Sequence, residues 1–400
     1  MRILFLTPNF PNPSEPAVGM ANYYTARSLV RRGHDVAVIA AIPWVRALAR
    51  RGTGPPIPGN RRLDGIDVHH PRYYYPPGAL RATYGWFLWR SISAVADELL
   101  RRFRPDVVFS GWVHPEGDST LRIAALAGVP GIVWSGGSDV LLYSKDRARR
   151  HCIVDVLTRS DVVMCVSHHL KDAILELGVN PEKVHVVRNG IDTGVFRPGD
   201  RRDARRRLGL PLERRILLFV GWLVPVKGID VLIDACGTLV ADGVDVHLCL
   251  AGEGPLRETL RARVAEAALD ERVTFAGAVS HDALADWYRA ADLTVLPSHS
   301  EGVPNVLYES ISCGTPFVAS HVGGIGEIAD PVLDRLVPPG DVPALAGAIR
   351  DRLSSASAAS RVLVPGSWED HAQQIETIFQ DAIDARRRAG PQARQAPQAG

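Results

Sequence analysis

The chain has 400 residues, of which 46% are hydrophobic and 22% are charged, so it is long enough for two globular domains with full cores. No apolar run approaches the ~20 residues of a membrane span, and the apolar stretch 2–7 is too short for a signal peptide because Pro8 ends it. The five cysteines form no CxxC pair, which is typical of a reduced, cytoplasmic protein.

The net charge of +2 conceals an asymmetry, since residues 1–150 carry +9 and the remainder carries −7. A basic front half favours an anionic partner: a membrane surface, a phosphorylated acceptor or nucleic acid. A solvated, Arg-rich surface is the competing interpretation. Residues 43–90 interleave arginines with aromatic residues. That mixture fits an interfacial segment on anionic lipid, an aromatic-lined acceptor cleft, or arginine stems packed over exposed rings.

The chain opens with a predicted strand at 2–7, a Pro-rich loop that ends near Gly19, a helix at 21–32 and a strand at 35–41. This order is typical of a doubly wound sheet, in which the carboxyl ends of strands and the amino ends of helices face a ligand crevice. No GxGxxG sequence is present there, which disfavours NAD as a cofactor.

The same alternation continues through the first half of the chain. Helices are expected at 91–103, 119–127 and 149–159, and a further helix ends at 177. Strands are expected at 105–110, 131–135, 161–166 and 184–187. Sequence Asp64–Asp67 is expected to form a turn, and residues 136–139 a loop. An Asn-Gly pair and a Pro/Gly/Asp cluster follow residue 188, and we place the domain boundary there.

A second series of strands and helices follows, with strands expected at 216–220, 246–251, 273–275 and 293–296, and helices at 229–241, 256–268 and 282–290. Two such series predict an α/β protein of two Rossmann-like domains that face each other across a cleft. We expect the first domain at 1–188 and the second at 189–366. A helix at 367–385 would cross back toward the first domain, and residues 386–400 would be a disordered tail.

Three glycine-containing loops follow strands of the second domain, at 221–228, 251–256 and 275–277. Lys227 places a positive charge in the first loop, so a phosphate-binding role is natural, although the Walker A sequence is absent. An isolated lysine in such a loop would more commonly be a surface residue. Three loops at one rim of a parallel sheet together favour nucleotide binding.

Residues 296–327 contain two carboxylates, Glu301 in a loop and Glu309 on the helix that follows. Pro304 suits the first position of that helix, because its missing N–H has no partner there. If all eight steps were helical, the two carboxylates would lie ~12 Å apart along the axis, which suits an elongated ligand held at both ends. The helix amino end between them, with Gly302 allowing close approach, offers an anion site. Two acidic residues on a solvated helix are the alternative.

These residues together resemble the retaining family-4 glycosyltransferases of GT-B fold. The resemblance rests on the E-x7-E pair Glu301 and Glu309, on Lys227 in its loop, and on the Gly252–Pro255, Asn189–Asp192 and Gly323–Glu327 sequences. It covers the chain to about residue 385 and is most specific in 215–330. His70–Tyr73 and Pro115–Gly117 are similar to bacterial members that build surface polysaccharides.

The resemblance implies transfer of a hexose-type sugar from a nucleotide diphosphate sugar with retained anomeric configuration and no required metal. It implies that Lys227 binds the diphosphate, that Glu301 faces the donor sugar, and that Glu309 binds the ribose hydroxyls; Lys227 and Glu301 are the catalytic candidates. The other implied donor-binding residues are Gly19, Gly277, Gly302, Val303, Pro304, Asn305 and Val306. Candidate acceptor or cleft residues are His114, Gly137, Ser138, Asp139 and Asn189.

The implied acceptor is a glycan, a lipid-linked molecule or a small molecule, and we expect no nucleic-acid partner. We expect a cytoplasmic protein, either free or peripheral on the inner face of the membrane. No structural metal is expected, because His114 and His299 lack a second ligand at metal spacing.

Two positions depart from the family pattern. Trp222 stands where the phosphate loop usually has an arginine, and Gly136 stands where a histidine usually precedes Gly-Ser-Asp. Arg257 or an arginine of the first domain could supply the missing charge. The alternative function is therefore a catalytically weak or silent relative that binds a nucleotide sugar or glycan as a pathway subunit.

Overall fold

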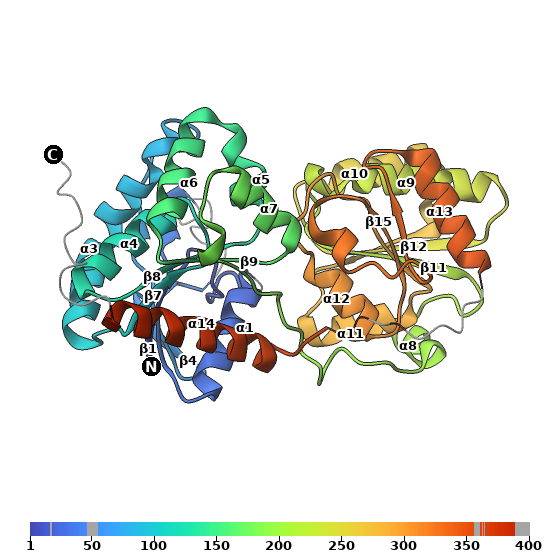
Figure 1. The fold of residues 1–400 in the computed structure, drawn as a ribbon. Coiled ribbons are helices and arrows are strands. Elements are labelled where there is room, and N and C mark those ends of the chain that lie inside the picture. Colours follow the sequence, from blue (N-terminus) through green and yellow to red (C-terminus); the bar gives the residue numbers. More distant parts are fainter. Residues whose placement is uncertain (17, 46–54, 356–360, 362, 364, 389–400) are drawn as a thin grey trace. The chain divides into compact units, whose positions relative to one another are not determined.

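The computed structural model describes residues 1–400 except 17, 46–54, 356–360, 362, 364 and 389–400 (Figure 1). The chain divides into two compact units, the first comprising Met1–Gly190 and the segment that begins at Trp368, the second comprising Ile191–Ser367. Each unit contains a mostly parallel β-sheet with helices packed against it.

The first unit is built on an eight-stranded sheet in the order β10-β9-β8-β7-β1-β2-β5-β4. Its pairs are parallel except for the β4–β5 hairpin. The strands are β1 (Arg2–Leu6), β2 (Asp35–Ile39), β4 (Asn60–Leu63), β5 (Ile66–His69), β7 (Val107–Ser110), β8 (Gly131–Ser135), β9 (Val162–Cys165) and β10 (Val184–Val186), with a separate parallel pair β3 (Ile42–Pro43) and β6 (Arg72–Tyr73).

The helices of the first unit are α1 (Met20–Arg31), α3 (Tyr84–Arg102), α4 (Glu116–Ala127), α5 (Ser138–Leu141), α6 (Arg147–Arg159), α7 (His168–Glu176) and α14 (Trp368–Arg388). Helix α14, the red helix in Figure 1, packs on α1. The Trp368 and Tyr24 rings stack with centroids 5.4 Å apart, and His371 Nε2 lies 3.0 Å from Thr25 Oγ1. These contacts join the end of the chain to its beginning.

Residues 43–90 are more regular than the sequence indicated, because they contain the short strands β4, β5 and β6 and the start of α3. Only Asp64 and Gly65, with φ of 47° and 85°, form the expected turn, and Ile66 and Asp67 already belong to β5. A core that includes Leu88 and Ile92 takes in the aromatic side chains of Tyr73, Tyr75, Phe87 and Trp89. Large side chains of the segment that remain exposed are Tyr74, Leu80 and Trp86.

The second unit is built on a six-stranded sheet in the order β13-β12-β11-β14-β15-β16, in which every pair is parallel. Its strands are β11 (Arg215–Val220), β12 (Val246–Ala251), β13 (Val273–Gly277), β14 (Leu293–Leu296), β15 (Phe317–Ser320) and β16 (Arg335–Val337). Its helices are α8 (Arg201–Leu208), α9 (Ile229–Ala241), α10 (Arg257–Glu266), α11 (His281–Ala290), α12 (Asn305–Ser312) and α13 (Val342–Ser354). The central strands β12 and β14 are buried along their whole length, as their continuous apolar runs require.

The carboxyl end of the chain differs from the prediction. Residues 386–388, expected in the disordered tail, form the last turn of α14, where Arg386 donates to Asp161 at 3.2 Å. Arginines suit this position because a helix carries partial negative charge at its carboxyl end. The rest of the predicted tail, 389–400, lies outside the described residues. Among the helices that the structure describes, none combines the length and the apolar content that crossing a bilayer requires.

Candidate active site

The sheet of the second unit has a topological switch point between β11 and β14. The chain builds outward from β11 through β12 to β13 on one side, and from β14 through β15 to β16 on the other. Ligands of doubly wound sheets bind outside the carboxyl ends of the strands at such a point. Lys227 lies in the loop after β11 and Glu301 in the loop after β14, so both predicted catalytic residues follow the strands that flank the switch point.

The two side chains form an ion pair. Lys227 Nζ donates to Glu301 Oε1 at 2.6 Å, and Ser298 Oγ donates to the same oxygen at 2.6 Å. Both bonds end on Oε1, which leaves Oε2 of Glu301 for another donor. Lys227 likewise uses one of the three N–H bonds of its ammonium group in this contact. The pair can therefore bind a ligand without first breaking.

Backbone contacts hold these loops together and explain why glycines occur in them. Gly228 has φ of 61°, and a Cβ there would lie 2.3 Å from the carbonyl oxygen of Pro297. Gly323 has φ of 56°, and a Cβ there would lie 1.9 Å from the carbonyl oxygen of Glu301. The amide of Gly324 donates to the Gly302 carbonyl at 2.8 Å. The loop that carries Glu301 is thus fixed by backbone packing on two sides.

The amino end of α12 lies directly after this loop. Pro304 is the residue before the helix, with extended backbone angles, and Asn305 is the first helical residue, so the predicted start was one position early. Proline fits here because the residue before a helix needs a non-helical ψ, which its ring permits. No side chain caps the helix. Val303 and Pro304 are buried, whereas Gly302, Asn305 and Val306 keep partial exposure.

Glu309 lies in the middle of α12, where Tyr288 Oη of α11 donates to its Oε2 at 2.8 Å. The Tyr288 side chain is fully buried. Burial raises the pKa of Glu309 to about 7, and the hydrogen bond from Tyr288 opposes that rise. The carboxylate keeps partial solvent access, so it can accept hydrogen bonds from a ligand hydroxyl once it is ionised.

Gly277, at the end of β13, adopts φ of 72°, and its carbonyl accepts from the Gly252 amide at 2.8 Å. Beside it, Glu253 pairs with Arg257. The charge of Arg257 is therefore already engaged by a carboxylate, which weakens its candidacy as the replacement for the missing phosphate-loop arginine. Trp222 is 58% exposed at the first loop of this rim.

The first unit has its own switch point, between β1 and β7. Gly19, in the loop after β1, and Asn189 both line a pocket of about 380 Å³ there, together with Gly136. Gly19 has φ of 71°, and a Cβ would lie 2.0 Å from the Asn9 carbonyl oxygen, so no larger residue fits. Gly19 thus belongs to a different unit from the other predicted donor residues.

A second pocket of the first unit, about 220 Å³, contains His114 and a group that the sequence did not reveal, Glu116. Its walls include the rings of Tyr73, Tyr75, Tyr84, Trp112 and Tyr143. Glu116 is 2% exposed, and none of the residues that the structure describes makes a hydrogen bond to its Oε2. Burial raises its pKa to about 8, and the nearby Asp139 carboxylate adds to the rise. Burial also lowers the pKa of His114, whose Nε2 lies 3.1 Å from the Arg81 carbonyl oxygen.

The remaining candidate acceptor residues require a correction. Asp139 is fully buried and accepts from Ser135 Oγ at 2.8 Å and from the amides of Val113 and Gly137 at 3.1 Å. Gly137 is buried as well, and Ser138 and Asp139 belong to the short helix α5 rather than to a loop. The Asp139 carboxylate therefore fixes two loops to each other.

Comparisons with known proteins agree with the two-unit architecture. Residues 18–195 match the family described as Glycosyltransferase Family 4, and residues 200–362 match Glycosyl transferases group 1. The putative teichuronic acid biosynthesis glycosyltransferase TuaC of Bacillus subtilis is 30% identical over 363 residues, which cover 87% of this chain and 88% of TuaC. D-inositol 3-phosphate glycosyltransferase of Acidothermus cellulolyticus is 36% identical over 233 residues, which cover 54% of this chain and 52% of that relative.

The chain thus spans about half the length of several curated relatives that it matches. Among solved structures, Anabaena HepE in complex with UDP-glucose aligns with a TM-score of 0.69 over 96% of this chain and 98% of that one. At 20% identity, this likeness concerns the fold. From the two family matches, the near full-length similarity to TuaC and the shared fold, the chain belongs to the family-4 glycosyltransferases, enzymes of GT-B fold with two Rossmann-like domains.

Proposed function

We propose that this protein transfers a hexose-type sugar from a nucleotide diphosphate sugar to a glycan, lipid-linked or small-molecule acceptor, with retention of anomeric configuration. The observation that carries the proposal is the Lys227–Glu301 ion pair at the switch point of the second unit, beside the uncapped amino end of α12. The relatives named as glycosyltransferases and the UDP-glucose complex of a structural neighbour support the class of donor.

In this proposal the diphosphate binds between Lys227 and the amino end of α12. Both are positive, and both are held before the donor arrives: the lysine by Glu301, the helix by the backbone contacts of Gly302. Preorganised positive charge stabilises the negative charge that develops on a leaving diphosphate. No metal is needed for that task, so we propose that activity persists in the presence of a chelator.

The two carboxylates then bind opposite parts of the donor. Glu301 offers Oε2 to the hydroxyls of the sugar, and its bond to Lys227 holds the carboxylate in place. Glu309 accepts hydrogen bonds from the ribose hydroxyls, oriented by Tyr288. The acceptor oxygen forms a bond to the anomeric carbon as the bond to the diphosphate breaks, and the departing diphosphate takes the acceptor proton.

We propose that the acceptor binds in the first unit, at the aromatic pocket that contains His114 and Glu116. Aromatic rings offer flat apolar faces to the C–H faces of a sugar, and a protonated Glu116 can donate a hydrogen bond to a hydroxyl. Gly19 and Asn189 line the neighbouring pocket of the same unit.

We further propose that the protein works in the cytoplasm, with an anionic membrane surface as a partner of its first unit. Tyr74, Leu80 and Trp86 are each more than half exposed, and arginines 72, 81 and 90 of the same segment are exposed as well. Aromatic and basic side chains together favour the headgroup region of anionic bilayers. Co-sedimentation with phosphatidylglycerol vesicles, reduced in Trp86→Ser, tests this; equal sedimentation of both proteins contradicts it.

The test of the function is a transfer assay with labelled UDP-, GDP-, ADP- and dTDP-sugars against a panel of glycan and lipid-linked acceptors, followed by NMR of the product. We expect a product from one nucleotide class, with the anomeric configuration of the donor, formed equally well with EDTA. An inverted product overturns the proposed stereochemistry. Donor binding without hydrolysis or transfer on any acceptor supports instead the alternative function, a catalytically silent protein that binds a nucleotide sugar. The exposed Trp222 in place of arginine would then explain the missing activity.

A further inference from the structure

The sheet of the second unit carries a second charged pocket, on the edge opposite the donor loops. It has a volume of about 460 Å³, and arginines 201, 215, 352 and 361 line it together with Asp292. Arg215 starts β11 and Asp292 directly precedes β14, while Pro316 of the same pocket precedes β15. These residues stand at the amino ends of parallel strands, whereas Lys227 and Glu301 follow the carboxyl ends. The pocket is therefore separate from the candidate active site.

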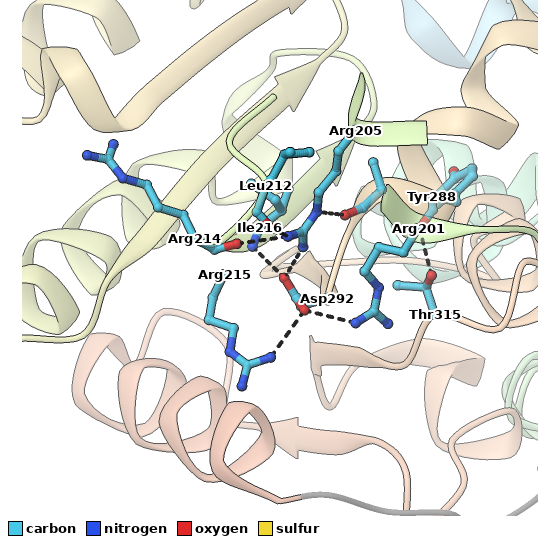
Figure 2. Close-up of polar contacts among 10 residues, drawn as sticks. Arg201, Arg205, Leu212, Arg214, Arg215, Ile216, Tyr288, Asp292 and Thr315 are labelled. Carbon is cyan, nitrogen blue, oxygen red and sulfur yellow. Dashed lines mark hydrogen bonds and ion pairs between the residues drawn. The ribbon is translucent and has the colours of Figure 1, made fainter. Parts of the chain in front are cut away.

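Asp292 neutralises part of the positive charge of this pocket. Its carboxylate accepts from Arg205 Nη2 at 2.5 Å, from Arg201 Nη1 at 3.0 Å and from Arg215 Nη1 at 3.4 Å, as Figure 2 shows. The Ile216 amide donates to it at 2.7 Å. Arg205 is buried beside Asp292 and also donates to the carbonyls of Ala290, Leu212 and Arg214. One buried arginine thus neutralises the carboxylate, and Arg201 and Arg215 reach it from more exposed positions as additional cations.

Asp334 neutralises another part of the positive charge, that of Arg361. Its two oxygens accept from Arg361 at 2.6 and 2.7 Å and from the amides of Phe317 and Asp330. All four bonds are compatible with a single ionised carboxylate, which has room for about four. Asp334 is satisfied by these partners, and no further arginine is required to neutralise it.

Arg352 remains without a carboxylate partner in the part of the chain that the structure describes. It is 9% exposed and lines the pocket from α13. Its Nη1 donates to the Ser355 carbonyl at 2.9 Å, and its Nε has no hydrogen-bond partner among the described residues. Burial and the neighbouring Arg335 and Arg361 lower its pKa, against the attraction of Asp334. The carboxyl end of a helix favours a nearby cation, but the carbonyl there accepts from only one N–H group of the Arg352 guanidinium. A buried guanidinium with an unused donor, among like charges, is stabilised when an anion binds.

We propose that this pocket binds a small phosphate-bearing anion, which the Arg352 guanidinium contacts together with Arg201 and Arg215. Planar guanidinium groups match phosphate oxygens in bidentate geometry, and several around one cavity select a multivalent oxyanion over chloride. The cavity has room for a diphosphate group with a small substituent. The proposal does not rest on the transfer activity, because it concerns the opposite edge of the sheet.

Isothermal titration of the full chain with inorganic pyrophosphate at constant ionic strength tests this. Because pyrophosphate can also enter the donor site, the titration is done in a Lys227→Met background, where binding is expected to persist. Adding Arg352→Met should weaken that binding at least tenfold, as loss of a charge-assisted hydrogen bond requires. Arg215→Met, at a half-exposed position, should weaken it less.

The matched control is Arg350→Met, on the same helix α13, because Arg350 pairs with Asp242 outside the pocket. It should leave pyrophosphate affinity unchanged. Circular dichroism melts of each variant check that the second unit remains folded. The proposal is overturned if pyrophosphate binding disappears entirely with Lys227→Met, or if Arg352→Met and Arg215→Met both bind as tightly as the background protein.

Discussion

Replacing Lys227 by methionine should affect catalysis and stability to very different extents, although the lysine contributes to both. In the folded protein its ammonium group lies 2.6 Å from Glu301 Oε1, with 22% of the lysine side chain and 10% of the glutamate side chain exposed. Glu301 keeps the Ser298 hydrogen bond when the lysine is lost. A partly exposed pair of this kind contributes about 1 kcal/mol, so the variant should unfold only slightly more easily.

The effect on turnover should be much larger. A preorganised donor that meets charge developing in the transition state contributes about 3 to 4 kcal/mol, which corresponds to a 10²- to 10³-fold loss of kcat. We expect Lys227→Met to show that loss at saturating donor, and Lys227→Arg to recover part of it. Initial rates with the best donor from the transfer screen, beside urea denaturation of each variant, measure both effects. If kcat of Lys227→Met stays within about threefold of the parent while stability falls, the lysine is structural and the reasoning is refuted.

Three further predictions concern buried charges. Burial raises the pKa of Glu309 to about 7, and the ribose contact needs the ionised carboxylate, so donor affinity in calorimetry should fall by up to about tenfold per pH unit below pH 7. Glu309→Gln should abolish this pH dependence, and an unchanged pH profile in that variant contradicts the ribose-binding role of Glu309. Arg205→Met should destabilise the protein by about 3 kcal/mol in urea denaturation by leaving Asp292 with weaker partners. Arg207→Met, exposed on the same helix, should cost much less, and equal costs would argue against the buried pair. Burial raises the pKa of Glu116 from 4.5 to about 8, so between these pH values the folded state keeps a proton that the unfolded chain has lost, and stability falls as pH rises. Glu116→Gln should therefore be more stabilising at pH 8 than at pH 5, by about 1.4 kcal/mol for each pH unit over which only the folded state holds the proton, and the same change at both pH values would contradict this.

The sequence was most informative where local signals coincide. A short apolar run ended by proline predicted β14 at Leu293–Leu296, and the structure has the same bounds. Glycine loops after parallel strands placed Lys227 and Glu301 at one rim, because parallel strands end at a common edge. Their ion pair was not predicted, since it joins residues 74 positions apart through backbone contacts that only the folded sheet creates.

Burial was the property that the sequence could not supply. Glu116 follows a proline at the start of a helix, where an acidic residue is normally solvated and favourable to the helix dipole. Here Tyr73, Tyr75 and Tyr84 line the same pocket as Glu116, and the sequence left the position of these rings open to several interpretations. The burial of Asp139 was not predicted for the same reason. Helix α8 was not predicted at all, because five of its eight residues are arginines and only Ala204 and Arg205 are buried, which leaves little apolar periodicity.

The most direct test of the donor site is calorimetry of UDP, GDP, ADP and dTDP with the parent protein, Lys227→Met and Glu309→Ala. We predict that one nucleoside diphosphate binds the parent protein. Glu309→Ala should weaken its binding at least tenfold through the ribose, and Lys227→Met should weaken it through the diphosphate. If no nucleoside diphosphate binds, or if the best one binds all three proteins equally, the donor site is not where Lys227, Glu301 and Glu309 lie.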